Sequence, residues 1–347
     1  MNKFFNSILK IVPGFALALA IAFIAQWIEG VLPIHLIGSS VIALFIGMII
    51  NNFWKPDILT PGLKFTSKKV LKFAIILLGA SLSIGTILNV GKLSLVVMIF
   101  TLLTCFGGGY FIGKALGLNW KLSNLISAGT GICGGSAIAA LSSVIDAEDN
   151  DVAYALSATF LFDMAMIVLF PIMGRAMNLS DMAYGLRTGT AVKDTSSVVA
   201  AGFAYSEAAG DFATMDKLTR SLSIIPVVVI LAMIKVRLKQ KAAIAAGSSE
   251  KISAKGKIKF SSLFPWFILG FLALAVVNSF GVIPATVSAG AKSLSKFLMV
   301  SALAAIGLNT SFKQMSKSGP KPMLHGFIIS ALVVVVAITV EKFMGIV

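Results

Sequence analysis

Long apolar stretches follow one another along almost the whole chain, and they constrain its fold more than any other feature. A helix that crosses a lipid bilayer needs about 20 mostly apolar residues. Eleven stretches meet this requirement, at about 12–29, 34–51, 71–89, 93–113, 122–143, 151–174, 182–206, 219–236, 262–280, 286–312 and 323–343. Because lipid offers the backbone no hydrogen-bond partners, only a closed barrel or helices can span it, and stretches of this length predict helices. We therefore expect an all-α polytopic membrane protein with about 11 transmembrane helices.

The composition excludes several classes of protein. The chain is 57% hydrophobic and 12% charged, whereas soluble domains are about 45–50% apolar and about 25% charged. A soluble enzyme, a nucleic-acid-binding module and a disordered chain are all inconsistent with these values. The formal net charge of +15 resides in the gaps between apolar stretches, where basic residues set orientation in a membrane rather than bind nucleic acid.

Basic residues concentrate in alternate gaps, and the longest hydrophilic segment, 237–261, is among the most basic. Cytoplasmic loops of membrane proteins carry such an excess of Lys and Arg. We therefore expect a cytoplasmic N-terminus and an external C-terminus. Acidic residues at 146–151 and 207–216 are then expected outside.

Two segments, 129–140 and 189–201, are unusual for helices that face lipid. The first has four glycines between positions 129 and 135, and each costs a helix about 1 kcal/mol relative to Ala. Small-residue packing between helices is the alternative explanation. Interrupted helices are tolerated where they line a cavity, and they mark binding sites in transporters. We therefore predict a broken helix at 129–136.

The order of the spans suggests an internal repeat. We expect an extra N-terminal span at 1–33, a first five-span repeat at 34–176, and a second, inverted repeat at 177–347. The fifth span and the tenth, with its small and polar run at 305–311, then form two crossed discontinuous helices. Segments 129–140 and 189–201 share a sequence pattern, but they lie two spans apart and would run parallel, so we interpret the pattern as a local device.

Ionisable residues inside the spans are few and costly, so they are expected to face a partner or water. Asp163 lies near the middle of its span, and Lys193 and Asp194 lie within the next one. We expect Lys193 to face the cavity and pair with one of these acids; the alternative is that it reaches the membrane surface.

The predicted site combines these charges with the small and polar residues of the interrupted helices. We expect substrate-binding roles for Thr130, Cys133, Gly134, Gly135, Ser136, Lys193, Asp194, Asn309 and Thr310, and ion-coupling roles for Asp163, Lys193 and Asp194. Two cysteines and two histidines without ligand spacing predict neither a metal site nor a cofactor.

Several motifs together resemble the YeiH-type family of bacterial membrane proteins, whose members are named as sulfate exporters. They are Pro13-Gly14, 75–79 (IILLG), 132–134 (ICG), 198–202 (VVAAG), 265–267 (PWF) and 304–308 (AAIGL). The family is similar to the superfamily of bile-acid sodium symporters and sodium/proton antiporters, which implies inverted repeats and crossed discontinuous helices. The chain departs from the family pattern at Ser81, Asp163 and Lys193, where a basic residue, a small residue and His are expected.

We therefore expect a secondary active transporter of the bacterial cytoplasmic membrane that moves a small anionic solute, such as sulfate or an organic sulfonate or carboxylate, by alternating access. The alternative is a sodium/proton exchanger that uses the intramembrane Asp and Lys residues. No nucleotide-binding or intramembrane-protease motif occurs, so we expect neither ATP drive nor an enzyme. The expected partners are the bilayer and the solute; the sequence leaves open whether the chain forms a homodimer and whether it couples to sodium or protons.

Overall fold

The computed structural model describes residues 2–31, 38–54, 56–245, 265–310 and 319–346, and these residues form helices and no strand. Among the described residues, six helices are long and apolar enough to cross a membrane, and three shorter apolar helices accompany them. Large apolar side chains such as Phe23, Phe111 and Trp266 are exposed on the outside. The predicted all-helical membrane protein is confirmed, whereas the predicted count of eleven spans is not.

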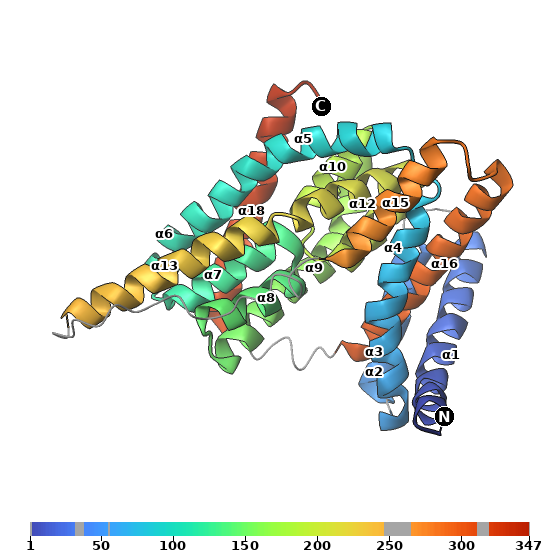
Figure 1. The fold of residues 1–347 in the computed structure, drawn as a ribbon, viewed down its shortest axis with the longest axis horizontal. Helices are drawn as coiled ribbons and strands as arrows, with labels where there is room; N and C mark the ends of the chain where they lie inside the picture. The colour runs from blue at the N-terminus through green and yellow to red at the C-terminus, as the bar shows by residue number, and fades with distance from the viewer. Residues whose placement is uncertain (1, 32–37, 55, 246–264, 311–318, 347) are drawn as a thin grey trace.

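Five helical segments form one side of the molecule, which we call the scaffold body (Figure 1). They are α1 (Asn2–Val31), α2 (Ser39–Phe53), α3 (Thr60–Phe65) continuing through a π turn into α4 (Leu71–Gly79), α15 (Trp266–Ser279) and α16 (Ala285–Asn309). Glycines let these backbones touch: a Cβ atom added at Gly307 of α16 would lie 2.1 Å from the carbonyl oxygen of Leu44 in α2. Close contact of this kind is how small residues stabilise helix pairs in lipid.

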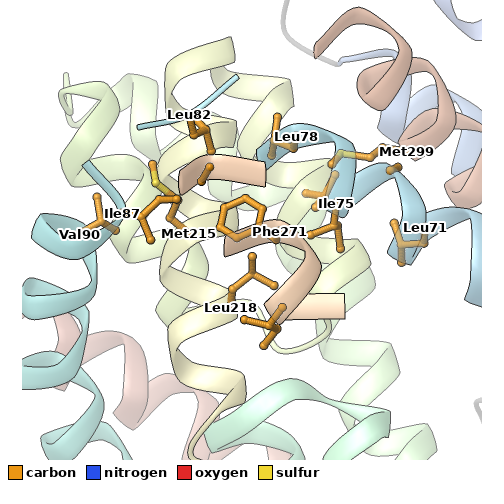
Figure 2. Packing of buried hydrophobic residues seen from close by; sticks show 14 of the residues in the cluster. Leu71, Ile75, Leu78, Leu82, Ile87, Val90, Met215, Leu218, Phe271 and Met299 are labelled. Atoms are coloured by element: carbon orange, nitrogen blue, oxygen red, sulfur yellow. The ribbon is translucent and has the colours of Figure 1, made fainter. Parts of the chain in front are cut away.

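The remaining helices form the hairpin body. They are α5 (Ile84–Leu103), α6 (Gly109–Ala115), α7 (Trp120–Ala128), α8 (Gly135–Ile145), α9 (Asp149–Ala176), α10 (Asp181–Ala191), α11 (Thr195–Tyr205), α12 (Glu207–Ser221), α13 (Ile224–Ala245) and α18 (Pro320–Phe343). Apolar side chains join the two bodies. Figure 2 shows Ile75, Leu78 and Phe271 of the scaffold body packed with Met215 and Leu218 of α12.

The segment predicted to cross the membrane at 122–143 turns back on itself instead. Helix α7 continues through a π turn at Gly129–Cys133, breaks at Gly134, and is followed by α8. The two ends of this first hairpin (120–145) lie together, because the Lys121 ammonium donates to the carbonyl oxygen of Asp146 at 2.5 Å. The chain therefore enters and leaves at the same end of the molecule, and the predicted fifth span is wrong.

The segment predicted to cross at 182–206 forms a second hairpin (181–205). Helix α10 ends at Ala191 and α11 begins at Thr195. The ends again meet, since the hydroxyl of Ser206 donates to the Asp181 carboxylate at 2.6 Å and that of Tyr205 donates to the carbonyl oxygen of Leu179 at 2.6 Å. This prediction of a complete span is therefore wrong as well.

The two hairpins enter the molecule from opposite ends of α9. At the start of α9, Asp151 accepts a hydrogen bond from Asn119 beside the first hairpin. At its other end, Arg175 donates to the carbonyl oxygen of Ala204 in the second hairpin. Residues 120–176 and 181–245 thus form two consecutive hairpin-and-helix units of opposite orientation. Because a hairpin replaces each of two predicted spans, residues 146–151 and 175–181 lie on the sides of the membrane opposite to those predicted. Segments after the second hairpin keep their predicted sides.

The predicted interruption of the tenth span is wrong as far as the described residues reach. Helix α16 runs without a break to Asn309, and Thr310 follows as its C-cap; positions 311–318 lie outside the described residues. The second broken segment is instead 189–201. Its resemblance to 129–140 places the two breaks at equivalent positions, Gly134 and Asp194. The two segments do not run parallel as predicted, because each one reverses within the protein.

Candidate functional site

The tips of the two hairpins, around Gly134 in the first and around Asp194 in the second, touch each other. Gly134 has φ 63° and ψ −132°, a backbone conformation that is open almost only to glycine. A Cβ atom added there would lie 3.0 Å from the Cα atom of Asp194. The contact therefore requires glycine for two reasons, its backbone conformation and the absence of a side chain. It brings together two half-helix ends that start from opposite ends of the molecule.

Asp163, from the middle of α9, holds the second tip in place. Its carboxylate accepts hydrogen bonds from the backbone N–H groups of Lys193, at 2.8 Å, and Asp194, at 2.7 Å. An unpaired N–H group inside a membrane protein is costly, so this carboxylate satisfies the donors that the break releases. Asp163 is 1% exposed, and its partners are backbone groups rather than the predicted ammonium of Lys193.

The two tips present different helix N-termini. Asp194 caps α11 by accepting from the backbone N–H and the hydroxyl of Ser196. Helix α8 begins at Gly135, its N-cap residue Gly134 has no side chain with which to cap it, and Ser136 in its first turn is exposed. An uncapped helix N-terminus carries free N–H donors and a partial positive charge, both of which favour an anion.

Lys193 carries a buried charge beside these tips. Its side chain is fully buried, and the ammonium nitrogen lies 4.3 Å from the centre of the Phe162 ring. Within the part of the chain that the structure describes, this nitrogen has no hydrogen-bond acceptor, and the buried hydroxyl of Thr130 has no partner either. The surface-reaching alternative for Lys193 is therefore wrong. An ammonium without an acceptor can receive an anionic group.

Two further cations, Lys217 and Arg220, were not predicted as site residues, because they lie at the boundary between an external gap and the span predicted at 219–236. Helix α12 begins at Glu207, and both side chains are fully buried beneath the hairpins. Lys217 donates to the carbonyl oxygen of Val192 at 2.8 Å, and Arg220 donates to that of Gly131 at 2.8 Å. Their spacing of three residues, which places them on one helix face, was the available signal.

The structure gathers most of the predicted site residues and separates two of them. Seven lie on the tips or in the turn before them: Thr130, Cys133, Gly134, Gly135, Ser136, Lys193 and Asp194. Asn309 and Thr310 instead end α16 in the scaffold body, where Asn51 of α2 donates to the carbonyl oxygen of Thr310 at 2.6 Å. The candidate site is therefore the pair of tips together with Asp163, Lys217 and Arg220.

Comparison with known proteins gives relatives that span nearly the whole chain. A UPF0324 membrane protein of Clostridium tetani is 55% identical over 334 residues, which are 96% of this chain and 97% of that protein. UPF0324 membrane proteins of Streptococcus agalactiae and Fusobacterium nucleatum are each 36% identical, over 96% and 90% of this chain and over 98% and 92% of those proteins.

A family model agrees with these relatives. It is described as "Conserved hypothetical protein 698" and matches residues 13–326. The resemblance to YeiH-type proteins is confirmed at the level of this family, while the names of the relatives state a membrane protein and no solute. The chain therefore belongs to the conserved hypothetical protein 698 family of multi-pass membrane proteins.

Proposed function

We propose that the protein is a secondary active transporter that carries a small anion across the bacterial cytoplasmic membrane by alternating access. The observation that carries the proposal is the contact of two opposed helical hairpins at Gly134 and Asp194. Broken helices whose ends meet inside a membrane protein form the substrate sites of transporters. The N-terminus is cytoplasmic in this proposal, because the basic gaps then lie on the cytoplasmic side.

The charge at the tips favours an anion over a cation. The first tip offers the uncapped N-terminus of α8, and the second offers the Lys193 ammonium, which has no acceptor in the described structure. A monovalent or divalent oxyanion, such as sulfate, a sulfonate or a carboxylate, supplies acceptors for both. The sodium/proton exchanger needs a carboxylate that is free to exchange ions, whereas Asp163 is bonded to two backbone N–H groups.

The packing of the two bodies is consistent with alternating access. The second hairpin lies directly against the scaffold body, where a Cβ atom added at Gly38 would be 2.9 Å from the Cα atom of Ala204 in α11. Apolar side chains of α2, α9, α11 and α16 pack together at this contact. Apolar side chains form few directional bonds that would fix one position, so the hairpin body can move against the scaffold body and expose the tips to either side.

Counterflow in proteoliposomes tests this function. Purified protein is first screened by thermal shift against sulfate, sulfonates and carboxylates, because a ligand raises the melting temperature only if it prefers the folded state. The anion that stabilises it most is then loaded into proteoliposomes, and uptake of the radiolabelled anion is followed. We expect saturable counterflow, its loss in Lys193→Ala, and its retention in Lys92→Ala, which removes an exposed lysine of α5.

Two outcomes would reject the proposal. Non-saturable flux without counterflow would indicate a passive channel. Sodium flux driven by a pH gradient, without any added anion, would indicate the exchanger.

A further inference from the structure

The carbonyl ends of the two broken helices are the second polar feature of the tips. A helix that stops inside a membrane protein leaves its last carbonyl groups without hydrogen-bond donors, and these groups carry a partial negative charge. In transporters built from broken helices, such carbonyl ends commonly coordinate a coupling sodium ion. Here the ends in question are the turn before Gly134 and the end of α10 at Ala191.

Both carbonyl ends are occupied by side chains of α12. The ammonium nitrogen of Lys217 lies 2.8 Å from the carbonyl oxygen of Val192 and 3.4 Å from that of Gly189. The guanidinium of Arg220 donates to the carbonyl oxygen of Gly131 at 2.8 Å and to the hydroxyl of Thr101 at 2.9 Å.

We propose that Lys217 and Arg220 are built-in cations that take the places where coupling sodium ions would bind, so that the protein operates without sodium. This inference rests on the proposed transport function and specifies how that function is energised. The ammonium of Lys217 contacts two carbonyl oxygens of one helix end, which is part of the oxygen shell that a sodium ion requires. Because the cation is covalently attached, it moves with the hairpin body and is never released.

The charges around the tips agree with this assignment. Three buried cations lie around the tips, Lys193, Lys217 and Arg220, and the acids near them are the buried Asp163 and Asp216 and the half-buried Asp194. Asp216 lies beside Lys217 in the sequence and accepts from the hydroxyl of Thr190 in α10 at 3.4 Å. Among these six groups of the described structure, the Lys193 ammonium has no hydrogen-bonding partner, while Asp216 leaves only its Oδ1 atom unpaired.

Thermal unfolding in matched salts tests the inference on the full-length protein, without any solute. Wild-type protein is melted in sodium chloride and in choline chloride at equal ionic strength, and we expect equal melting temperatures. Lys217→Ala is expected to melt lower in choline chloride and to recover about 2–4 °C in sodium chloride, because a small cation can enter the vacated position and bind only the folded state. Lys217→Arg keeps a tethered charge and is expected to show no response to sodium, as is Lys92→Ala.

Stabilisation of the wild type by sodium relative to choline would overturn the inference, and so would a Lys217→Ala variant that folds but melts equally in both salts. If Lys217→Ala does not fold, the wild-type comparison still decides, together with counterflow measured with and without sodium. Counterflow that requires sodium overturns the inference while leaving the transport function intact. Absence of counterflow for every anion rejects the transport function, a result that is independent of the melting comparison.

Discussion

At the scale of single residues, the structure of the tips depends on particular residue types at particular positions. Gly134 is in a left-handed conformation against Asp194, and Asp163 supplies two acceptors to two backbone donors. The sequence indicated all three positions, because dense glycines and buried charges are rare in helices that face lipid. It did not show that Asp163 bonds to backbone, since the donors exist only after the second segment has broken.

The backbone strain at Gly134 gives the first prediction. In Gly134→Ala, the methyl group meets the backbone of Asp194 and the residue is forced into a conformation that L-residues avoid, so we expect a loss of roughly 1–3 kcal/mol in the free energy of unfolding. Gly290→Ala is the matched control, because a Cβ atom there meets nothing within 4 Å. Denaturation followed by circular dichroism measures both. Equal stability of Gly134→Ala and wild type would contradict the assigned strain.

The acceptor role of Asp163 gives the second prediction. An amide side chain has one acceptor oxygen, so Asp163→Asn leaves one buried N–H group unpaired, and we expect a loss of about 1–3 kcal/mol of stability. Asp149→Asn, at the exposed start of the same helix, is expected to change stability by less than about 1 kcal/mol. A variant Asp163→Asn as stable as Asp149→Asn would show that the carboxylate does not hold the tip.

At the scale of helices, the sequence predicted the break at 129–136, but it predicted neither the break within 189–201 nor the reversal of either segment. The apolar runs at 122–143 and 182–206 are as long as a complete span, and hydropathy does not distinguish one long helix from two short ones that fold back. The reversal is determined by tertiary contacts between residues that are distant in the sequence. One example is the hydrogen bond from Lys121 to the carbonyl oxygen of Asp146, 25 positions away. Hydropathy does not predict the first half of α12, because that half is polar. The sequence therefore did not predict that Lys217 and Arg220 lie on a helix inside the protein.

Thiol labelling distinguishes the hairpins from complete spans, which is the third prediction. Cysteines are placed singly at Asp149 and Asn178, with Cys105 and Cys133 retained because both are buried. With two hairpins, Asp149→Cys reacts from the same side of the membrane as Lys114→Cys, and Asn178→Cys reacts from the same side as Lys342→Cys. Complete spans at 122–143 and 182–206 would give the reverse pattern with a membrane-impermeant maleimide in intact cells and in inverted vesicles.

At the scale of the whole molecule, ion pairs at one end connect the scaffold body to the hairpin body. Lys292 of α16 lies 2.8 Å from Asp211 of α12, and Lys296 lies 2.5 Å from Glu207. Partly exposed pairs of this kind contribute little stability, about 0–1 kcal/mol each, so they can break in the transport cycle that we propose. They mark two surfaces that must separate if the hairpin body moves against the scaffold body.

Joining these surfaces covalently is therefore expected to stop transport. We predict that Lys292→Cys with Asp211→Cys, linked by a short reducible thiol reagent, loses counterflow and recovers it when the link is reduced. Lys235→Cys with Asp146→Cys is the matched control: these side chains lie 2.8 Å apart, but α13 and the end of the first hairpin belong to one body, so the link leaves counterflow unchanged. If both linked proteins transport equally well, the bodies do not move apart at this end; if both stop, the hairpin body itself must deform. If the two hairpins carry the solute together as one rigid unit, counterflow is lost when Lys292→Cys is linked to Asp211→Cys and is retained when Lys235→Cys is linked to Asp146→Cys.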